Sequence, residues 1–137
     1  IHRHGGDVDK YVGDEIVALF TGPEKEWNAC LAALEIQTYI LLYHDDLARL
    51  NVGIGINTGE VVLGRIGSER RADFTVIGDH VNFASRLCSQ AKAGEVIISD
   101  SSYQKIREHA EVTEPREITV KGKEKPQKVY LLTALNK

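Results

Sequence analysis

The chain opens with two short runs of β-forming residues, and a tight turn separates them. Residues 8–12 and 16–20 form the runs, and Gly13 and Asp14 between them tolerate the positive φ angles of hairpin turns. The pattern predicts a β-hairpin. Over residues 24–47, apolar side chains recur at helical spacing with no internal Gly or Pro, which predicts a long helix packed on a sheet.

Strand and helix patterns then alternate to the end of the chain. Gly53 and Gly55 lie inside a strand-like run, where glycine indicates a close approach of neighbouring backbone. Residues 67–73 are polar and predict a loop. The order of elements is typical of an α+β fold in which helices pack on a mostly antiparallel sheet. The further predicted strands are residues 51–57, 60–66, 74–77, 95–98, 112–120 and 128–133, and the further predicted helices are residues 80–91, which Gly94 follows, and 101–109, which Ser99 and Asp100 cap.

Length and composition indicate one domain over residues 1–137. The 137 residues, 42% of them hydrophobic and 27% charged, suffice for one hydrophobic core. A net charge of −3 and a pI near 6.0 argue against a nucleic-acid-binding surface. The sequence contains neither an apolar stretch of the roughly twenty residues needed to cross a bilayer nor a signal peptide, so we expect no membrane contact from this segment.

The cysteines and the absence of methionine add two further expectations. Cys30 and Cys88 fall within helical patterns, with no second pair at zinc-ligand spacing, which predicts buried free thiols in a reducing compartment. This favours a cytoplasmic domain, whether or not a longer protein tethers it to a membrane. Because the chain has no Met and hence no initiator, we expect it to be part of a longer protein.

Asn82 and Arg86 are a polar pair four residues apart on the predicted helix that follows strand 74–77. This spacing turns both side chains to one helix face, where an amide and a guanidinium can hold the same anionic group. The pair lies near the helix start, where free backbone N–H groups and the helix dipole also favour anions. The simpler alternative is that Asn82 caps the backbone locally and Arg86 lies on a solvated face.

Four segments follow one another in a distinctive order: Asp-Lys-Tyr-Val-Gly-Asp at 9–14, Gly-Ile-Asn-Thr-Gly-Glu-Val-Val-Leu-Gly at 55–64, Thr-Val-Ile-Gly-Asp-His-Val-Asn-Phe-Ala-Ser-Arg at 75–86 and Val-Lys-Gly-Lys at 120–123. Together they resemble the catalytic domain of the class III nucleotidyl cyclases, the adenylate and guanylate cyclases. The resemblance implies a ferredoxin-like sandwich that dimerises head to tail, with active sites between the protomers. It also implies conversion of a nucleoside triphosphate to a 3′,5′-cyclic monophosphate and pyrophosphate.

The resemblance further implies that Lys10 and Thr75 contact the base of the substrate. An ammonium only donates hydrogen bonds, so Lys10 suits the N1 acceptor of adenine, and the Thr75 hydroxyl can accept from the 6-amino group. Guanylate cyclases of the family usually carry Glu at the first of these positions. The two residues therefore favour ATP as the substrate, and cyclic AMP as the product.

The same resemblance assigns roles to the other site residues. Asp14 matches one of two aspartates that hold two Mg²⁺ or Mn²⁺ ions. Asn82 matches the residue that orients the ribose, and Arg86 the residue that neutralises charge growing on the α-phosphate as the 3′-oxygen attacks. Lys121 matches the triphosphate-binding lysine, with Lys123 as its substitute if the register differs by two. In a homodimer, the metal-binding aspartates of one protomer would face the base and phosphate residues of the other.

One part of the family pattern has no match in this chain. The first metal-binding aspartate of the family lies on a strand upstream of the hairpin. Asp7 and Asp9 do not replace it, since both precede Lys10 on the same predicted strand rather than facing Asp14 from a neighbouring one. We therefore expect an N-terminally truncated catalytic domain with no appreciable cyclase activity as an isolated chain.

Two alternatives remain open. The segment Val-Gly-Asp-Glu-Ile at 12–16 is similar to the Gly-Gly-Asp/Glu-Glu-Phe signature of diguanylate cyclases, although Val12 replaces the first glycine and that family has no counterpart to Asn82 with Arg86. The other alternative is a degenerate cyclase-homology module that dimerises and regulates attached domains without turnover. The intact motif positions argue against such decay.

Overall fold

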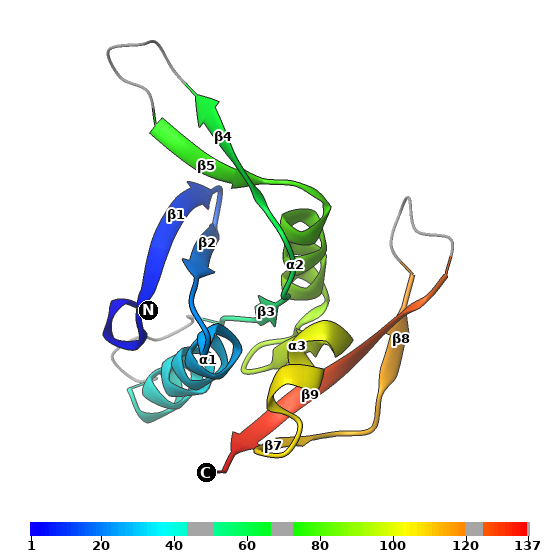
Figure 1. The fold of residues 1–137 in the computed structure, drawn as a ribbon. Helices are drawn as coiled ribbons and strands as arrows, with labels where there is room; N and C mark the ends of the chain where they lie inside the picture. The colour runs from blue at the N-terminus through cyan, green and yellow to red at the C-terminus, as the bar shows by residue number, and fades with distance from the viewer. Residues whose placement is uncertain (44–50, 67–72, 120–124, 137) are drawn as a thin grey trace.

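The computed structural model describes residues 1–43, 51–66, 73–119 and 125–136 (Figure 1). The backbone alone is described at 65–66 and 73–74. A short 3-10 helix, η1 (His2–His4), precedes the first strand. The described helices are α1 (Lys25–Leu42), α2 (Asp79–Gln90) and α3 (Asp100–Ile106), and the described strands are β1 (Gly6–Val12), β2 (Glu15–Phe20), β3 (Ile54–Ile56), β4 (Val62–Ile66), β5 (Asp73–Ile77), β6 (Val96–Ser99), β7 (Ala110–Val112), β8 (Arg116–Ile118) and β9 (Gln127–Leu135).

The strands form one larger sheet and two hairpins. The larger sheet has the order β3-β6-β9-β7, and β8 also pairs with β9. Its β3 and β6 strands are parallel, and its other pairs are antiparallel. β1 pairs with β2, and β4 with β5, as antiparallel hairpins. These antiparallel-dominated sheets with three helices among the described residues confirm the predicted α+β fold class.

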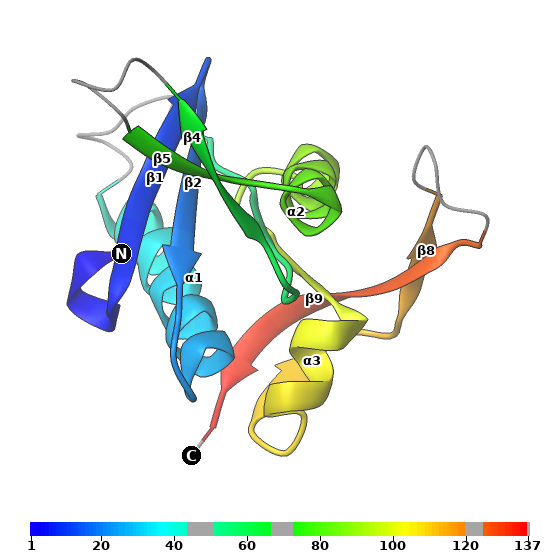
Figure 2. The same cartoon turned by 45° about the horizontal axis from the view of Figure 1, so that its top comes forward.

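Helices cover both faces of the larger sheet, which makes the fold a sandwich. Successive β6 residues point to opposite faces, because side chains alternate along a strand. Val96 and Ile98 pack in one cluster with residues of α1, α3 and β9, whereas Ile97 packs in a second cluster with Phe83 and Leu87 of α2. Figure 2 shows β9 running between α2 and α3. The position of α2 is therefore fixed by a core of its own.

The glycines of the β3 segment allow α2 to approach it closely, as predicted. A side chain at Gly55 would lie 2.7 Å from the carbonyl oxygen of Ala84, and one at Gly53 would lie 2.5 Å from that of Ala91. Both oxygens belong to backbone, which cannot move aside as a flexible side chain would. The short distance between α2 and β3 therefore depends on glycine.

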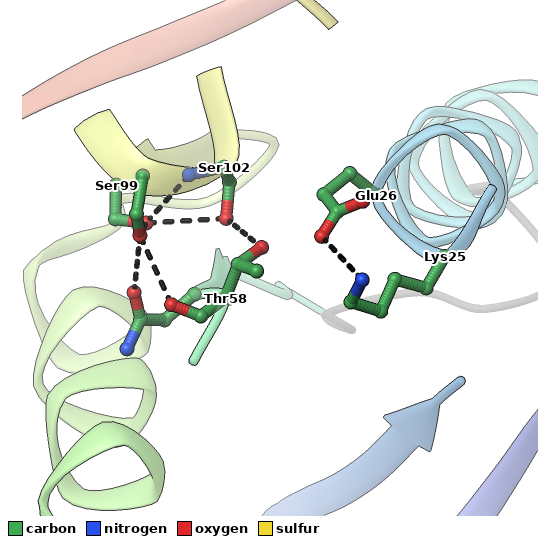
Figure 3. A network of polar contacts seen from close by, with 7 residues as sticks. Lys25, Glu26, Thr58, Ser99 and Ser102 are labelled. Atoms are coloured by element: carbon green, nitrogen blue, oxygen red, sulfur yellow. Dashed lines mark hydrogen bonds and ion pairs between the residues drawn. The ribbon is translucent and has the colours of Figure 1, made fainter. Parts of the chain in front are cut away.

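A polar network attaches the turn after β3 to the start of α3 (Figure 3). The Ser99 side chain accepts a hydrogen bond of 3.2 Å from the Ser102 backbone N–H, which confirms Ser99 as the N-cap. The Ser102 hydroxyl lies 2.8 Å from the Thr58 hydroxyl, and the Ser101 hydroxyl donates to the Asn57 side chain and the Thr58 carbonyl. Ordering this turn fixes where β4 begins, and hence the hairpin that carries β5.

Several predicted boundaries were wrong. The strand expected over 112–120 is two short strands, β7 and β8, which are separated around Pro115; proline has no N–H to donate to a ladder. The strand expected over 51–57 forms ladder pairs only at Ile54–Ile56. Helix α1 ends at Leu42, and the rest of its expected span lies largely outside the described residues. Of the loop expected over 67–73, Asp73 instead begins β5, and residues 67–72 lie outside the described residues.

The two cysteines are free thiols, as expected, but only Cys30 is fully buried; Cys88 is half-buried. Burial, with a smaller contribution from the Glu26 carboxylate, raises the pKa of Cys30 from 9.0 to about 12. No described helix is both long and apolar enough to span a membrane.

The Cys30 thiol predicts a loss of stability in alkali. Its folded-state pKa exceeds its unfolded value, so the stability it contributes is complete below pH 9 and falls by about 1.4 kcal/mol per pH unit as the pH rises from 9 toward 12. Urea unfolding of the wild type and of Cys30→Ala at pH 8 and pH 10 isolates this effect. We expect the free-energy difference between the two proteins to shrink by about 1.4 kcal/mol at the higher pH. An unchanged difference would mean that the thiol titrates alike in both states.

Candidate active site

Lys10 on β1 and Thr75 on β5 are in direct contact, although 65 positions separate them in the sequence. The Lys10 Nζ donates one hydrogen bond of 2.8 Å to the Thr75 Oγ1 and another of 2.8 Å to the Val76 carbonyl oxygen. Thr75 is 8% exposed, and the Lys10 side chain is 31% exposed. A ligand that meets both side chains would therefore approach from the Lys10 side.

Asp9 completes this contact, although the sequence motifs assign it no role at the site. The Thr75 hydroxyl donates a hydrogen bond of 2.8 Å to the Asp9 Oδ2, and the Val76 backbone N–H donates to the same carboxylate at 3.3 and 3.4 Å. The Lys10 Nζ lies 3.6 Å from the Asp9 Oδ2. We call Asp9, Lys10 and Thr75 the β1–β5 cluster.

A β-bulge allows neighbouring residues of β1 to contact the same strand. The β1–β2 register pairs Val8 with Ala18 and Lys10 with Val17, so Asp9 is the extra residue between them. In a regular strand, Asp9 and Lys10 would point to opposite faces, whereas a bulge re-aims one of them. The available sequence signal for a special position of Asp9 was its occurrence within a strand-like run, since Asp is depleted in strands.

The side chains of Asp9 and Lys10 also satisfy the backbone of β5. Val76 faces Leu63 across the β4–β5 hairpin. Its N–H donates to Asp9 and its carbonyl oxygen accepts from Lys10, as the groups of a neighbouring strand would do. The cluster therefore joins the two hairpins, and β1 and β5 lie near each other in Figures 1 and 2.

Asn82 and Arg86 both lie on α2 and are exposed. Gly78, with a φ of 129° that favours glycine, turns the chain from β5 into this helix. The Asn82 backbone N–H donates to the Gly78 carbonyl within the first turn, and among the described residues no side chain caps the start of α2. The local capping proposed as the alternative for Asn82 is therefore wrong. The helical spacing puts both side chains on one face, beyond the end of the strand that carries Thr75.

Asp14 is exposed at the tip of the β1–β2 hairpin, beside Gly13 with a φ of 58°. The next residue, Glu15, accepts hydrogen bonds of 3.0 and 3.2 Å from the Ser85 hydroxyl. Ser85 precedes Arg86, so this contact attaches the hairpin tip to α2. Lys121 and Lys123, the predicted triphosphate ligands, lie outside the described residues.

The donor set around Asp14 does not by itself make a metal site. In the described part of the chain, no group of three or more His, Cys, Asp or Glu side chains is arranged to hold a metal ion. Asp9, on the same strand as Lys10, also carries a carboxylate. This carboxylate already accepts hydrogen bonds from the Thr75 hydroxyl and the Val76 backbone N–H. Any metal site that includes Asp14 therefore needs ligands from elsewhere.

The sequence matches the family model of the adenylate and guanylate cyclase catalytic domain over residues 8–134. The chain belongs to this family. Cyclase domains of this class are lyases that form cyclic nucleotides and use divalent metal ions. The membership confirms the resemblance that the four sequence segments indicated.

Similar proteins include cyclases of both base specificities. An adenylate cyclase of Anabaena cylindrica is 43% identical over 96 residues, which are 64% of this chain and 19% of that protein. The guanylyl cyclase Cya2 has a TM-score of 0.91 at 30% identity, with 98% of this chain and 73% of that chain covered. The adenylyl cyclase CyaB of P. aeruginosa has a TM-score of 0.87 at 29% identity, with coverage of 97% and 74%.

The cyclase domain described here is short relative to these proteins. The chain spans about a quarter or less of the length of the curated relatives that it matches.

Solved neighbours include one cyclase domain in complex with GTP and another, of converted specificity, in complex with ATPαS. Membership of the cyclase family therefore does not decide between ATP and GTP as the substrate.

Proposed function

We propose that this domain is the catalytic domain of an adenylate cyclase in an intracellular signalling protein, and that it converts ATP into 3′,5′-cyclic AMP and pyrophosphate. The observation that carries the proposal is the contact between Lys10 and Thr75. The ammonium can donate to N1 of adenine, and the hydroxyl oxygen can accept from the 6-amino group. In the same orientation, guanine would present a donor at N1 and an acceptor at position 6, which mismatches both groups.

The face of α2 that carries Asn82 and Arg86 would hold the ribose and the α-phosphate. Both side chains are exposed and lie in the helix that directly follows β5, so a nucleotide whose base lies at Thr75 could extend its sugar and phosphates along them. Arg86 would stabilise the charge that grows on the α-phosphate as the 3′-oxygen attacks and pyrophosphate leaves. Lys121, or Lys123 in its place, would bind the triphosphate.

We further propose that the domain works as a homodimer with active sites at the interface. Support comes from large apolar side chains that are exposed on both hairpins: Tyr11, Val12 and Ile16 on β1 and β2, and Val62, Leu63 and Ile77 on β4 and β5. Exposed apolar groups gathered on neighbouring elements are typical of association surfaces. In such a dimer, Asp14 of one protomer would face the nucleotide bound by the other.

Asp14 would contribute one carboxylate to a pair of Mg²⁺ or Mn²⁺ ions, with the other ligands coming from the substrate phosphates, water and protein groups outside the described residues. Such ions would neutralise triphosphate charge and lower the pKa of the attacking hydroxyl. The expectation that the 137-residue chain in isolation has no appreciable cyclase activity stays a prediction. It fits the described residues, among which no group of three or more His, Cys, Asp or Glu side chains is arranged to hold a metal ion.

The base specificity predicts a switch by substitution. Lys10→Glu combined with Thr75→Cys should shift the ratio of kcat/KM for ATP over GTP toward GTP, because glutamate can accept from the N1–H of guanine and the competing ammonium is gone. Initial rates of cyclic AMP and cyclic GTP formation measure this in the active protein that contains this chain. Lys105→Glu makes the same charge change at an exposed site on α3 and should leave the ratio unaltered. Equal turnover of ATP and GTP by the wild type would refute the proposed specificity.

Arg86 provides a test of the chemical step. Arg86→Ala should lower kcat by about a hundredfold with little change in KM for ATP, since the guanidinium acts mainly on charge that develops in the transition state. The exposed Arg107 after α3 offers a matched control, and Arg107→Ala should retain wild-type kinetics. If Arg86→Ala kept the wild-type kcat, Arg86 would belong to a solvated face of α2.

A further inference from the structure

The hydrogen bonds within the β1–β5 cluster have only one consistent set of directions. A carboxylate only accepts and an ammonium only donates, so the Thr75 hydroxyl must give its proton to Asp9 and accept from Lys10. A hydroxyl has one proton and two lone pairs. Thr75 therefore keeps one unused lone pair and no unused proton.

Lys10 is constrained in the same way. Two of its three N–H donors point to Thr75 and to the Val76 carbonyl, each at 2.8 Å. The Asp9 oxygen at 3.6 Å is too far for a hydrogen bond. Toward a ligand, the cluster thus presents one donor from Lys10 and one acceptor from Thr75.

We propose that Asp9 is a specificity-determining positioning residue, which makes Thr75 a pure acceptor by holding its hydroxyl proton. This inference rests on the proposed use of ATP. Without Asp9, the Thr75 hydroxyl could rotate and donate to a 6-oxo group, so it would accept either purine. With Asp9 in place, Thr75 can accept a hydrogen bond from a 6-amino group. A 6-oxo group would instead face a lone pair of Thr75 and form no hydrogen bond with it.

The position of Asp9 suits this role. Its side chain is only 9% exposed, and it accepts from the Val76 N–H as well as from Thr75, so its carboxylate is held against β5 from two sides. The bulge in β1 is what allows Asp9 to reach Thr75 beside Lys10. Asp7 lies two residues earlier on the same strand and is exposed, which makes it a natural control.

Asp9→Asn is the informative substitution. Its amide oxygen can still accept from the Val76 N–H, while its NH₂ group can donate to Thr75 and release the hydroxyl proton toward the ligand. In the active protein that contains this chain, we expect the kcat/KM ratio of GTP to ATP to rise about tenfold. The reason is that the 6-oxo group of guanine would gain one hydrogen bond from Thr75 in place of a mismatch. Inosine triphosphate, which shares the 6-oxo group, should gain to a similar degree. Asp7→Asn should leave both ratios unchanged.

A double-mutant cycle separates this role from a merely structural one. In a Thr75→Val background there is no hydroxyl to orient, so Asp9→Asn should no longer alter the ratios. The same shift in both backgrounds, or no shift in either, would overturn the role of Asp9 while leaving ATP as the substrate. A wild type that does not prefer ATP would overturn the proposed function itself. If Asp9→Asn is unfolded at the assay temperature, Asp9→Ser replaces it, because a serine hydroxyl can also donate to Thr75.

Discussion

The contact between β1 and β5 is the constraint on which the candidate site depends. The two strands belong to separate hairpins, and hydrogen bonds from Asp9 and Lys10 to the Thr75 side chain and the Val76 backbone link them. The β-bulge at Asp9 makes this link possible, since it lets two successive side chains reach the same strand. One irregularity in a strand thus positions both groups that would read the base.

The rest of the fold fixes the position of α2 relative to this contact. The helix packs on its own hydrophobic cluster, approaches β3 at Gly55 and is attached to the hairpin tip through Ser85 and Glu15. Gly78 connects it directly to the strand of Thr75. Asn82 and Arg86 therefore lie on a helix whose position relative to the β1–β5 cluster is fixed, although in the described part of the chain no hydrogen bond or ion pair to another element positions either side chain.

Local features of the fold could be predicted from the sequence, and non-local ones could not. The hairpin at Gly13 and Asp14, the cap at Ser99 and the helix after Gly78 follow from turn and capping chemistry within a few residues. The break near Pro115 had a local signal that the strand prediction overlooked. By contrast, the parallel pairing of β3 with β6 depends on segments about forty residues apart, and no local pattern specifies it.

The candidate site shows the same division. Lys10, Thr75, Asn82 and Arg86 were predicted through their motifs, and the geometry adds that the first two touch. The sequence motifs assign no role to Asp9, and its place next to Lys10 on one strand argues only against its binding a metal. Its contact with Thr75 could not be foreseen, because it depends both on the β1–β2 register and on a strand that arrives 66 positions later. Lys121 and Asp14 keep the roles assigned to them as proposals.

The central claim is that Lys10 and Thr75 read adenine, and a structure of the active protein with a non-hydrolysable ATP analogue tests it most directly. The account predicts the Lys10 Nζ at about 3 Å from N1 and the Thr75 Oγ1 at about 3 Å from the 6-amino nitrogen, with Asp9 still bound to Thr75. Adenine bound away from this cluster, or Lys10 bound to phosphate instead of base, would contradict it.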